Sequence, residues 1–192
     1  MITAIALNIA LVSLKGQTLH DAQNNNKNNE WYAYGGNAGG SRYSGLQQIN
    51  VENVKQLQVA WTYQTGELKK YEGTNAKEKA AFEATPIFID HTLYFSTPSC
   101  RVFAIDASSG TQKWIFDPKI NLKNGFSEIT SRGVSAWPAP GDKANSSVAK
   151  RIFIATLDGR LIALDAKNGA PLVYVGKEGT VSKYGKLFWD LN

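Results

Sequence analysis

The side chains best suited to binding a polar ligand are a carboxylate and a guanidinium in different strand-like segments, Glu83 and Arg132. Glu83 stands in the stretch FEATP, directly before an apolar run. A carboxylate there can accept hydrogen bonds from a polar ligand, and a guanidinium can bind a carboxylate through two parallel hydrogen bonds. From residue type alone, the simpler interpretation is a solvated loop acid at Glu83 and a surface cation at Arg132.

The other residues of chemical interest are the histidines and the cysteine. Cys100 is the single cysteine, which excludes an internal disulfide framework and a cysteine-based metal cluster. His20 lies in a polar stretch and His91 in a predicted turn, and we interpret neither as a ligand because a lone turn histidine is more often solvated. The sequence therefore supplies no recognisable set of metal ligands.

The composition is that of a globular domain rather than a disordered chain, with 43% hydrophobic and 19% charged residues among 192. The formal net charge is +5, but the basic residues are scattered, and the densest pair, Lys69 and Lys70, has acids nearby. A protein that follows nucleic-acid phosphates should show a basic stripe. We therefore predict no nucleic-acid partner.

The first residues differ in character from the rest. The apolar run Ile2–Leu14 is 13 residues long, shorter than a bilayer span of about 20. It could be a weak signal peptide, the tail of a transmembrane helix or a buried strand, and we favour the first two. The following stretch HDAQNNNKNNE is polar and indicates a linker. We thus expect an apolar segment and linker over 1–30 and one domain over 31–192.

The domain itself has the pattern of an all-β protein. Short apolar runs rich in β-branched and aromatic residues are separated by turn signals, among them LQVAWTYQT, ATPIFI and TLYFST. An internal repeat strengthens this prediction. YFSTPSCRVFAIDASSGTQKW (94–114) aligns without gaps to FIATLDGRLIALDAKNGAPLV (153–173) at an offset of 59, with six identities in 21 positions.

Each repeat predicts a β-hairpin with a tight turn. In the first copy Asp106 can accept hydrogen bonds from turn amides, Gly110 can adopt positive φ, and Trp114 on the outgoing strand can cover the neighbouring unit. Multi-stranded repeats of this length are typical of a β-propeller; the alternative is a β-sandwich with two similar hairpins. We predict a partial propeller of about three blades, with Trp61 and Trp114 in the core between blades.

The repeat and several motifs resemble the pyrroloquinoline quinone (PQQ) dependent dehydrogenases, with the membrane-associated glucose and quinate dehydrogenases the nearest branch. The resemblance is carried by the W-x-x-YGG opening at Trp31, by FEATP before a strand, by the tryptophan-bearing turn repeat and by SRGVSAWP. It extends from Trp31 to about Gly176. It implies part of an eight-bladed propeller that oxidises an alcohol or sugar with PQQ beside a bound Ca²⁺.

The resemblance also implies roles for the first two residues. The glutamate of the E-x-TP motif, here Glu83, hydrogen-bonds the quinone, and the arginine of the RG motif, here Arg132, pairs with a carboxylate of PQQ. We therefore expect both at the rim of the central channel, on the innermost strand of each blade. The sequence departs from the family before the RG motif, because GFSEITSRG has neither the adjacent cysteines nor the histidine found there and places Glu128 nearby.

By this resemblance the family's Ca²⁺ ligands, catalytic base and aromatic floor fall beyond the matched stretch. We therefore expect the N-terminal part of a periplasmic alcohol or sugar dehydrogenase, free or attached to the inner membrane, that passes electrons to a membrane quinone. We expect this chain to be inactive by itself. The alternative is a non-enzymatic propeller module of the cell envelope that binds other proteins.

Overall fold

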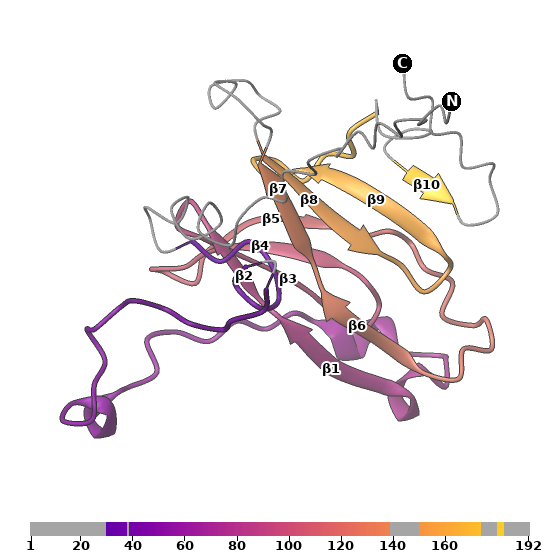
Figure 1. Cartoon of the computed structure of the whole chain (residues 1–192). Helices are drawn as coiled ribbons and strands as arrows, with labels where there is room; N and C mark the ends of the chain where they lie inside the picture. Colours follow the sequence, from indigo (N-terminus) through magenta and orange to yellow (C-terminus); the bar gives the residue numbers. More distant parts are fainter. Residues whose placement is uncertain (1–29, 38, 139–149, 174–179, 183–192) are drawn as a thin grey trace, which may run out of the picture.

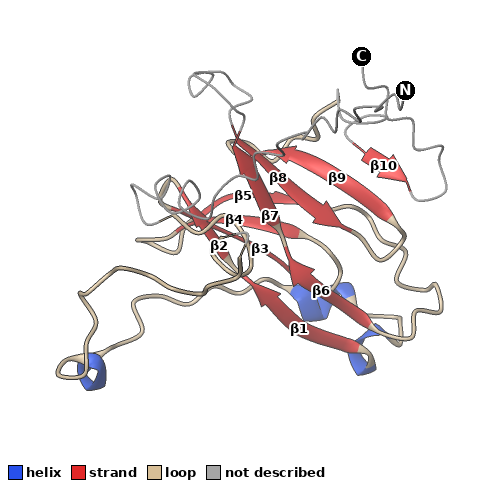
Figure 2. Ribbon diagram, in the orientation of Figure 1, coloured by secondary structure: helices blue, strands red, loops and turns tan. Residues whose placement is uncertain are grey.

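The computed structural model describes residues 30–37, 39–138, 150–173 and 180–182. Over these residues the chain consists mainly of short strands with a few helical turns (Figures 1 and 2), so the all-β prediction is confirmed. The apolar segment Ile2–Leu14 lies outside the described residues. No helix in the described part of the chain is long and apolar enough to cross a bilayer.

Two four-stranded antiparallel sheets form the body of the molecule. The first blade runs in the order β2 (Ile87–Ile89), β3 (Thr92–Ser96), β4 (Val102–Asp106) and β5 (Gln112–Phe116). The second blade has the order β10-β9-β8-β7, with β7 (Ser135–Pro138), β8 (Lys150–Ala155), β9 (Arg160–Asp165) and β10 (Thr180–Ser182). These sheets are the predicted blades of a partial propeller, and they do not close into a ring.

The turns after β4 and β9 confirm the repeat. Asp106 Oδ1 accepts hydrogen bonds from the backbone N–H groups of Ser108 and Ser109, both at 3.1 Å. Asp165 Oδ1 accepts the N–H of the residue two positions on, at 2.7 Å. Gly110 and Gly169 follow with φ of 72° and 74°, a conformation that other residues adopt only with strain. The aspartate and the glycine thus shape the same turn twice.

The chain that returns from the second turn differs from its counterpart at the position of Trp114. Leu172 N donates to Ala163 O at 2.9 Å, and β10 pairs with β9 with Thr180 opposite Ile162. Val173, which aligns with Trp114, is 70% exposed. The second hairpin therefore repeats the strand and the turn of the first, but not its tryptophan.

Two of the strands expected from the sequence are not formed as predicted. Leu57–Thr65 is not a strand, because no strand in the described part of the chain pairs with it. The run ATPIFI is divided at Pro86, which has no N–H to donate to a ladder. Before it lies β1 (Ala80–Thr85) and after it β2. The expected third copy of the repeat is therefore a docked segment rather than a blade.

Helical turns occupy the stretch before the first blade. They are η1 (Val54–Gln56), α2 (Glu67–Lys70) and η2 (Ala76–Glu78). η1 lies on an arm that runs away from the sheets, visible in violet in Figure 1. Apolar side chains of this arm are exposed, with Val51 at 88% and Val59 at 80%. The arm adds nothing to the core.

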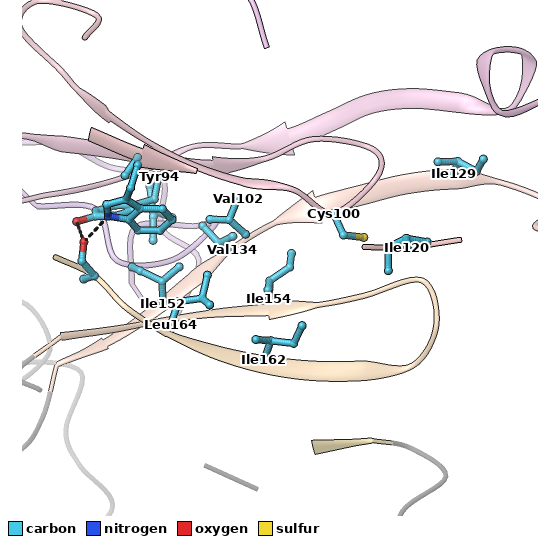
Figure 3. Close-up of a cluster of buried hydrophobic side chains, with 14 of the residues drawn as sticks. Tyr94, Cys100, Val102, Ile120, Ile129, Val134, Ile152, Ile154, Ile162 and Leu164 are labelled. Atoms are coloured by element: carbon cyan, nitrogen blue, oxygen red, sulfur yellow. Dashed lines mark hydrogen bonds between the residues drawn. The ribbon is translucent and has the colours of Figure 1, made fainter. Parts of the chain in front are cut away.

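The main core lies between the two blades (Figure 3). Alternate residues of β8 and β9 point toward the first blade, as the twofold period of a strand requires. They are Ile152, Ile154, Ile162 and Leu164, each at most 1% exposed. The first blade contributes Tyr94, Val102 and Trp114 to the same cluster. One layer of aliphatic side chains thus joins the blades.

Trp114 confirms the predicted packing between blades. Its side chain is 8% exposed, and its Nε1–H donates to Ala166 O at 3.0 Å. Tyr94 OH donates to the same carbonyl at 3.0 Å, and Figure 3 shows both bonds. A Cβ at Gly169 would come within 2.6 Å of the indole, so the ring lies flat against a turn that only glycine can form.

The same contact occurs one unit earlier along the chain. Trp61 Nε1–H donates to Ala107 O at 3.0 Å, and a Cβ at Gly110 would come within 2.6 Å of its ring. We call this arrangement the first junction and that of Trp114 and Ala166 the second junction. Trp61 is partly exposed, so its predicted place in the core is only partly confirmed.

An arginine makes a second contact at each junction. Arg101 Nη2 donates to Thr65 O at 2.9 Å, and Arg160 Nη2 donates to Pro118 O at 2.7 Å. Each acceptor lies four residues after the tryptophan of its unit, and the two arginines align in the repeat. Each unit is therefore fastened to the next by one indole and one guanidinium.

Candidate functional site

Glu83 and Arg132 lie on a two-stranded ribbon that belongs to neither blade. β1 pairs in parallel with β6 (Ile129–Gly133), and the two strands lie side by side in Figure 1. They lead directly into β2 and β7, the first strands of the two blades. We expected each residue on the innermost strand of a blade. That placement is wrong, because the chain forms the β1–β6 ribbon before it enters each blade.

A bulge in the ribbon brings the two side chains together. Phe82 pairs with Ser131, and Thr85 pairs with Gly133. Two residues of β1, Glu83 and the one after it, therefore lie opposite a single residue of β6, Arg132. Such an irregularity re-aims a side chain on the bulged strand. Arg132 Nη1 lies 2.6 Å from Glu83 Oε2. The predicted convergence of the two residues is thus present as an ion pair.

The pair is exposed rather than buried. The side chain of Arg132 is 78% exposed and that of Glu83 is 36% exposed. A guanidinium has five N–H donors, and the contact with Glu83 engages one of its nitrogens. The rest of the group faces solvent, where it can meet the carboxylate of a ligand.

Gly133 has a physical role in the RG motif. Its φ is +129°, and a Cβ on it would come within 3.0 Å of Thr85 O. The two strands of the ribbon can therefore approach this closely only because the residue after Arg132 has no side chain. The motif predicted the arginine, but the close approach that requires the glycine became evident only from the structure.

A cavity of about 370 Å³ lies next to the ribbon and α2. Its lining is mainly apolar, with Phe82 of β1 on one side, and includes Lys77 and Gln64 among its polar groups. Neither Glu83 nor Arg132 lines the cavity, so the ion pair lies outside it. The volume lies within the range of small-molecule sites.

Glu67 forms a buried polar network in the wall of this cavity. Its carboxylate accepts hydrogen bonds from Arg101 Nε at 3.0 Å, from Ser99 N at 2.9 Å and from Tyr71 OH at 3.1 Å. Burial alone would raise the pKa of Glu67, but the hydrogen bonds from Ser99 and Arg101 outweigh it and lower the pKa below 4.5. Sequence reasoning missed this network, because nothing distinguishes Glu67 from a surface acid.

The other residues considered from the sequence lie outside this site. His91 is exposed in the turn between β2 and β3, as predicted, and Glu128 is exposed just before β6. Cys100 is buried, and burial raises the pKa of its thiol to about 11. His20 lies outside the described residues. Among those that are described, no group of three or more His, Cys, Asp or Glu side chains could hold a metal ion.

A family model for the β-propeller domain of glucose, ethanol and alcohol dehydrogenases, named for PQQ, matches residues 31–187. The quinoprotein glucose dehydrogenase of Escherichia coli is 42% identical over 73% of this chain. The quinate/shikimate dehydrogenase (quinone) of Acinetobacter baylyi is 34% identical over 82% of it. These matches cover 18% and 20% of the two relatives, so the chain spans about a fifth of their length.

Solved structures agree with the fold. The quinohemoprotein alcohol dehydrogenase of Comamonas testosteroni superposes with a TM-score of 0.58 at 33% identity, over 75% of this chain and 19% of that one. A europium-containing methanol dehydrogenase gives a TM-score of 0.59 at 28% identity, over 80% of this chain and 24% of that one. The two blades and the ribbon are therefore similar to one part of a larger propeller.

Proposed function

This chain belongs to the family of PQQ-dependent dehydrogenases, and on that premise we propose that it is part of an alcohol or sugar dehydrogenase whose PQQ contacts the β1–β6 ribbon. The observation that supports this most directly is the ion pair of Glu83 and Arg132, at 2.6 Å on that ribbon. Family membership also favours this function over a non-enzymatic envelope module.

The exposed guanidinium of Arg132 fits a ligand that carries several carboxylates. Glu83 holds one nitrogen of the group, which limits the directions the side chain can take. The remaining N–H donors can form a bidentate pair with a ligand carboxylate. The second oxygen of Glu83 can accept a hydrogen bond from the ligand. PQQ, when bound, supplies a quinone carbonyl that accepts hydride from the carbinol of a substrate.

The described residues do not fit the Ca²⁺ ion that the family implies, because they contain no cluster of carboxylates that could hold a metal. We assign this chain no step that depends on a metal. We also propose a membrane quinone as the electron acceptor and a periplasmic location, free or at the inner membrane. Both rest on family membership, since relatives include quinoprotein and quinone-dependent dehydrogenases.

The proposal predicts weak PQQ binding by the 192-residue chain. In a water-exposed groove the pairing of Arg132 with a ligand carboxylate contributes at most a few kcal/mol, about the free energy of millimolar binding, so affinity should be about millimolar or weaker and should fall as salt increases. A titration of the protein with PQQ, followed by NMR, measures this. Arg132→Gln should abolish the saturable shifts, while Lys167→Gln, at an exposed cation in the turn after β9, should leave them unchanged.

Two results would contradict the proposal. Shifts that saturate equally well in Arg132→Gln would remove the ribbon from the binding site. Reduction of a dye by the purified chain with PQQ, Ca²⁺ and a sugar would show that the chain is active alone, which we propose it is not.

A further inference from the structure

The two faces of β6 have opposite environments. Ile129 and Ser131 are 1% and 6% exposed, whereas the side chain of Arg132 is 78% exposed. Strand alternation accounts for this difference. Whatever holds the buried face of β6 therefore also determines where the exposed face presents its guanidinium.

One hydrogen bond ties the buried face to the first blade. Ser131 Oγ lies 2.7 Å from Ser96 Oγ at the end of β3, and Ser96 is fully buried. In the described part of the chain, it is the only side-chain hydrogen bond that links the ribbon to a blade. The ribbon's other side-chain hydrogen bond, from Thr130 Oγ1 to Ala81 O at 3.0 Å, joins its own two strands.

The hydrogen bond between these two buried hydroxyls fixes the position of β6 on the first blade and also stabilises the fold. Each hydroxyl is shielded from water, so losing its partner leaves a polar group without a hydrogen bond. β6 therefore cannot slide or rotate on the blade without breaking this bond. Arg132 is the next residue, so a shift of the strand moves its backbone and with it the guanidinium.

We propose that Ser131 is a positioning residue for Arg132. Its hydrogen bond to Ser96 sets the position of β6, and thereby holds the guanidinium against Glu83 with its remaining donors directed at an incoming carboxylate. The inference rests on the proposed function only for the identity of that ligand. Positioning itself concerns residues that are in place without a ligand.

The test separates positioning from stability with two variants. Ser131→Ala leaves the Ser96 hydroxyl buried and unpaired, so it should lower both stability and ligand affinity. Combining it with Ser96→Ala removes both hydroxyls, which should restore much of the stability. A positioning role predicts that the double variant still binds PQQ about threefold to tenfold more weakly than the parent.

The control is Thr156→Val in the second blade. Thr156 is also a buried hydroxyl, which donates a hydrogen bond to Asp158 in the turn after β8 and makes no hydrogen bond with the ribbon. It should lower stability without changing PQQ affinity. If the double variant binds PQQ like the parent once its stability returns, Ser131 is merely structural and the proposal is overturned.

A second readout needs no ligand. The Nε–H resonance of Arg132 should shift on Glu83→Gln in the parent, because the ion pair is lost. That shift should shrink by about half or more in the double serine variant if the guanidinium has moved, and an undiminished shift would overturn the proposal. If the parent binds no PQQ at all, the proposed function fails, while this resonance still decides whether Ser131 positions Arg132.

Discussion

The two junctions make the same contacts but bury opposite partners. At the first junction the indole of Trp61 is partly exposed, while Arg101 and its partner Glu67 have side chains only 11% and 7% exposed. At the second junction the indole of Trp114 is 8% exposed, while Arg160 and Asp158 are 28% and 33% exposed. One junction buries its charges and the other its aromatic ring.

The difference follows from what lies on each side. A complete sheet lies behind each partner of the second junction, so apolar side chains exclude water around Trp114. The first junction joins a blade to a single segment and α2, which leaves the ring open to solvent. At the first junction the ion pair of Arg101 and Glu67 is therefore the contact most shielded from water. The repeat therefore specifies the contacts of a junction, while the neighbouring structure decides which of them carries stability.

The largest expected effect is at the indole of the second junction. Trp114→Ala should lower the free energy of unfolding by about 3–5 kcal/mol, because it removes a large buried ring and leaves a cavity. Trp61→Ala is the matched variant and should cost clearly less, since its ring is already partly solvated. Urea unfolding followed by circular dichroism measures both. Equal losses would mean that the two junctions do not differ as the burial of their rings indicates.

For the charged side chains the order of the two junctions should be reversed, with the larger loss of stability at the first junction. Glu67→Gln should cost about 1.5–3 kcal/mol at neutral pH, as hydrogen bonds to a charged group are lost. Asp158→Asn, at the more exposed pair, should cost less. The pKa of Glu67 is lower in the folded than in the unfolded chain, so this stabilisation is present above pH 4.5 and is lost as the pH falls through the folded pKa.

Urea unfolding at several pH values tests this dependence. The difference between the parent and Glu67→Gln should be largest near neutral pH and should narrow steadily below pH 4.5. A difference that stays constant over this range would show that the hydrogen-bond partners of Glu67 do not stabilise its ionised form in the folded protein.

The smallest effect concerns the additional contact of the second junction. Tyr94→Phe removes the hydroxyl that shares Ala166 O with Trp114 and should cost about 0.5–1.5 kcal/mol. The carbonyl keeps the indole as a donor, so the loss stays modest. Combining Tyr94→Phe with Trp114→Ala leaves Ala166 O without either donor, and the combined loss should exceed the sum of the single losses. Strict additivity would show that the two donors act independently.

The sequence was sufficient to predict elements that depend on local residues. The hairpin turns at Asp106 and Asp165, the blades of a partial propeller and the docking of Trp114 follow from turn chemistry and an ungapped repeat. The convergence of Glu83 and Arg132 was also predicted, from the E-x-TP and RG motifs.

What could not be predicted depends on partners distant in sequence. Leu57–Thr65 has the composition of a strand, but a strand needs a neighbour, and composition does not show whether one is present. The exposure of Arg132 and the burial of Glu67 are decided by which segments cover them. To predict the ribbon, one would have to know that Pro86 separates the pairing of β1 with β6 from that of β2 with β3. One would also have to know that Gly133 permits a close approach to Thr85.

The parallel pairing of β1 with β6 has a consequence for the order of folding. The hairpins of the first blade join residues that are close along the chain, whereas β1 and β6 are separated by that whole blade. Closing the longer loop costs more chain entropy, so we expect the ribbon to form after the blade has brought its ends together. We expect the ribbon amides to exchange with deuterium before those of β4. The proposed ligand-binding face is then expected to assemble after the first blade and to open before it.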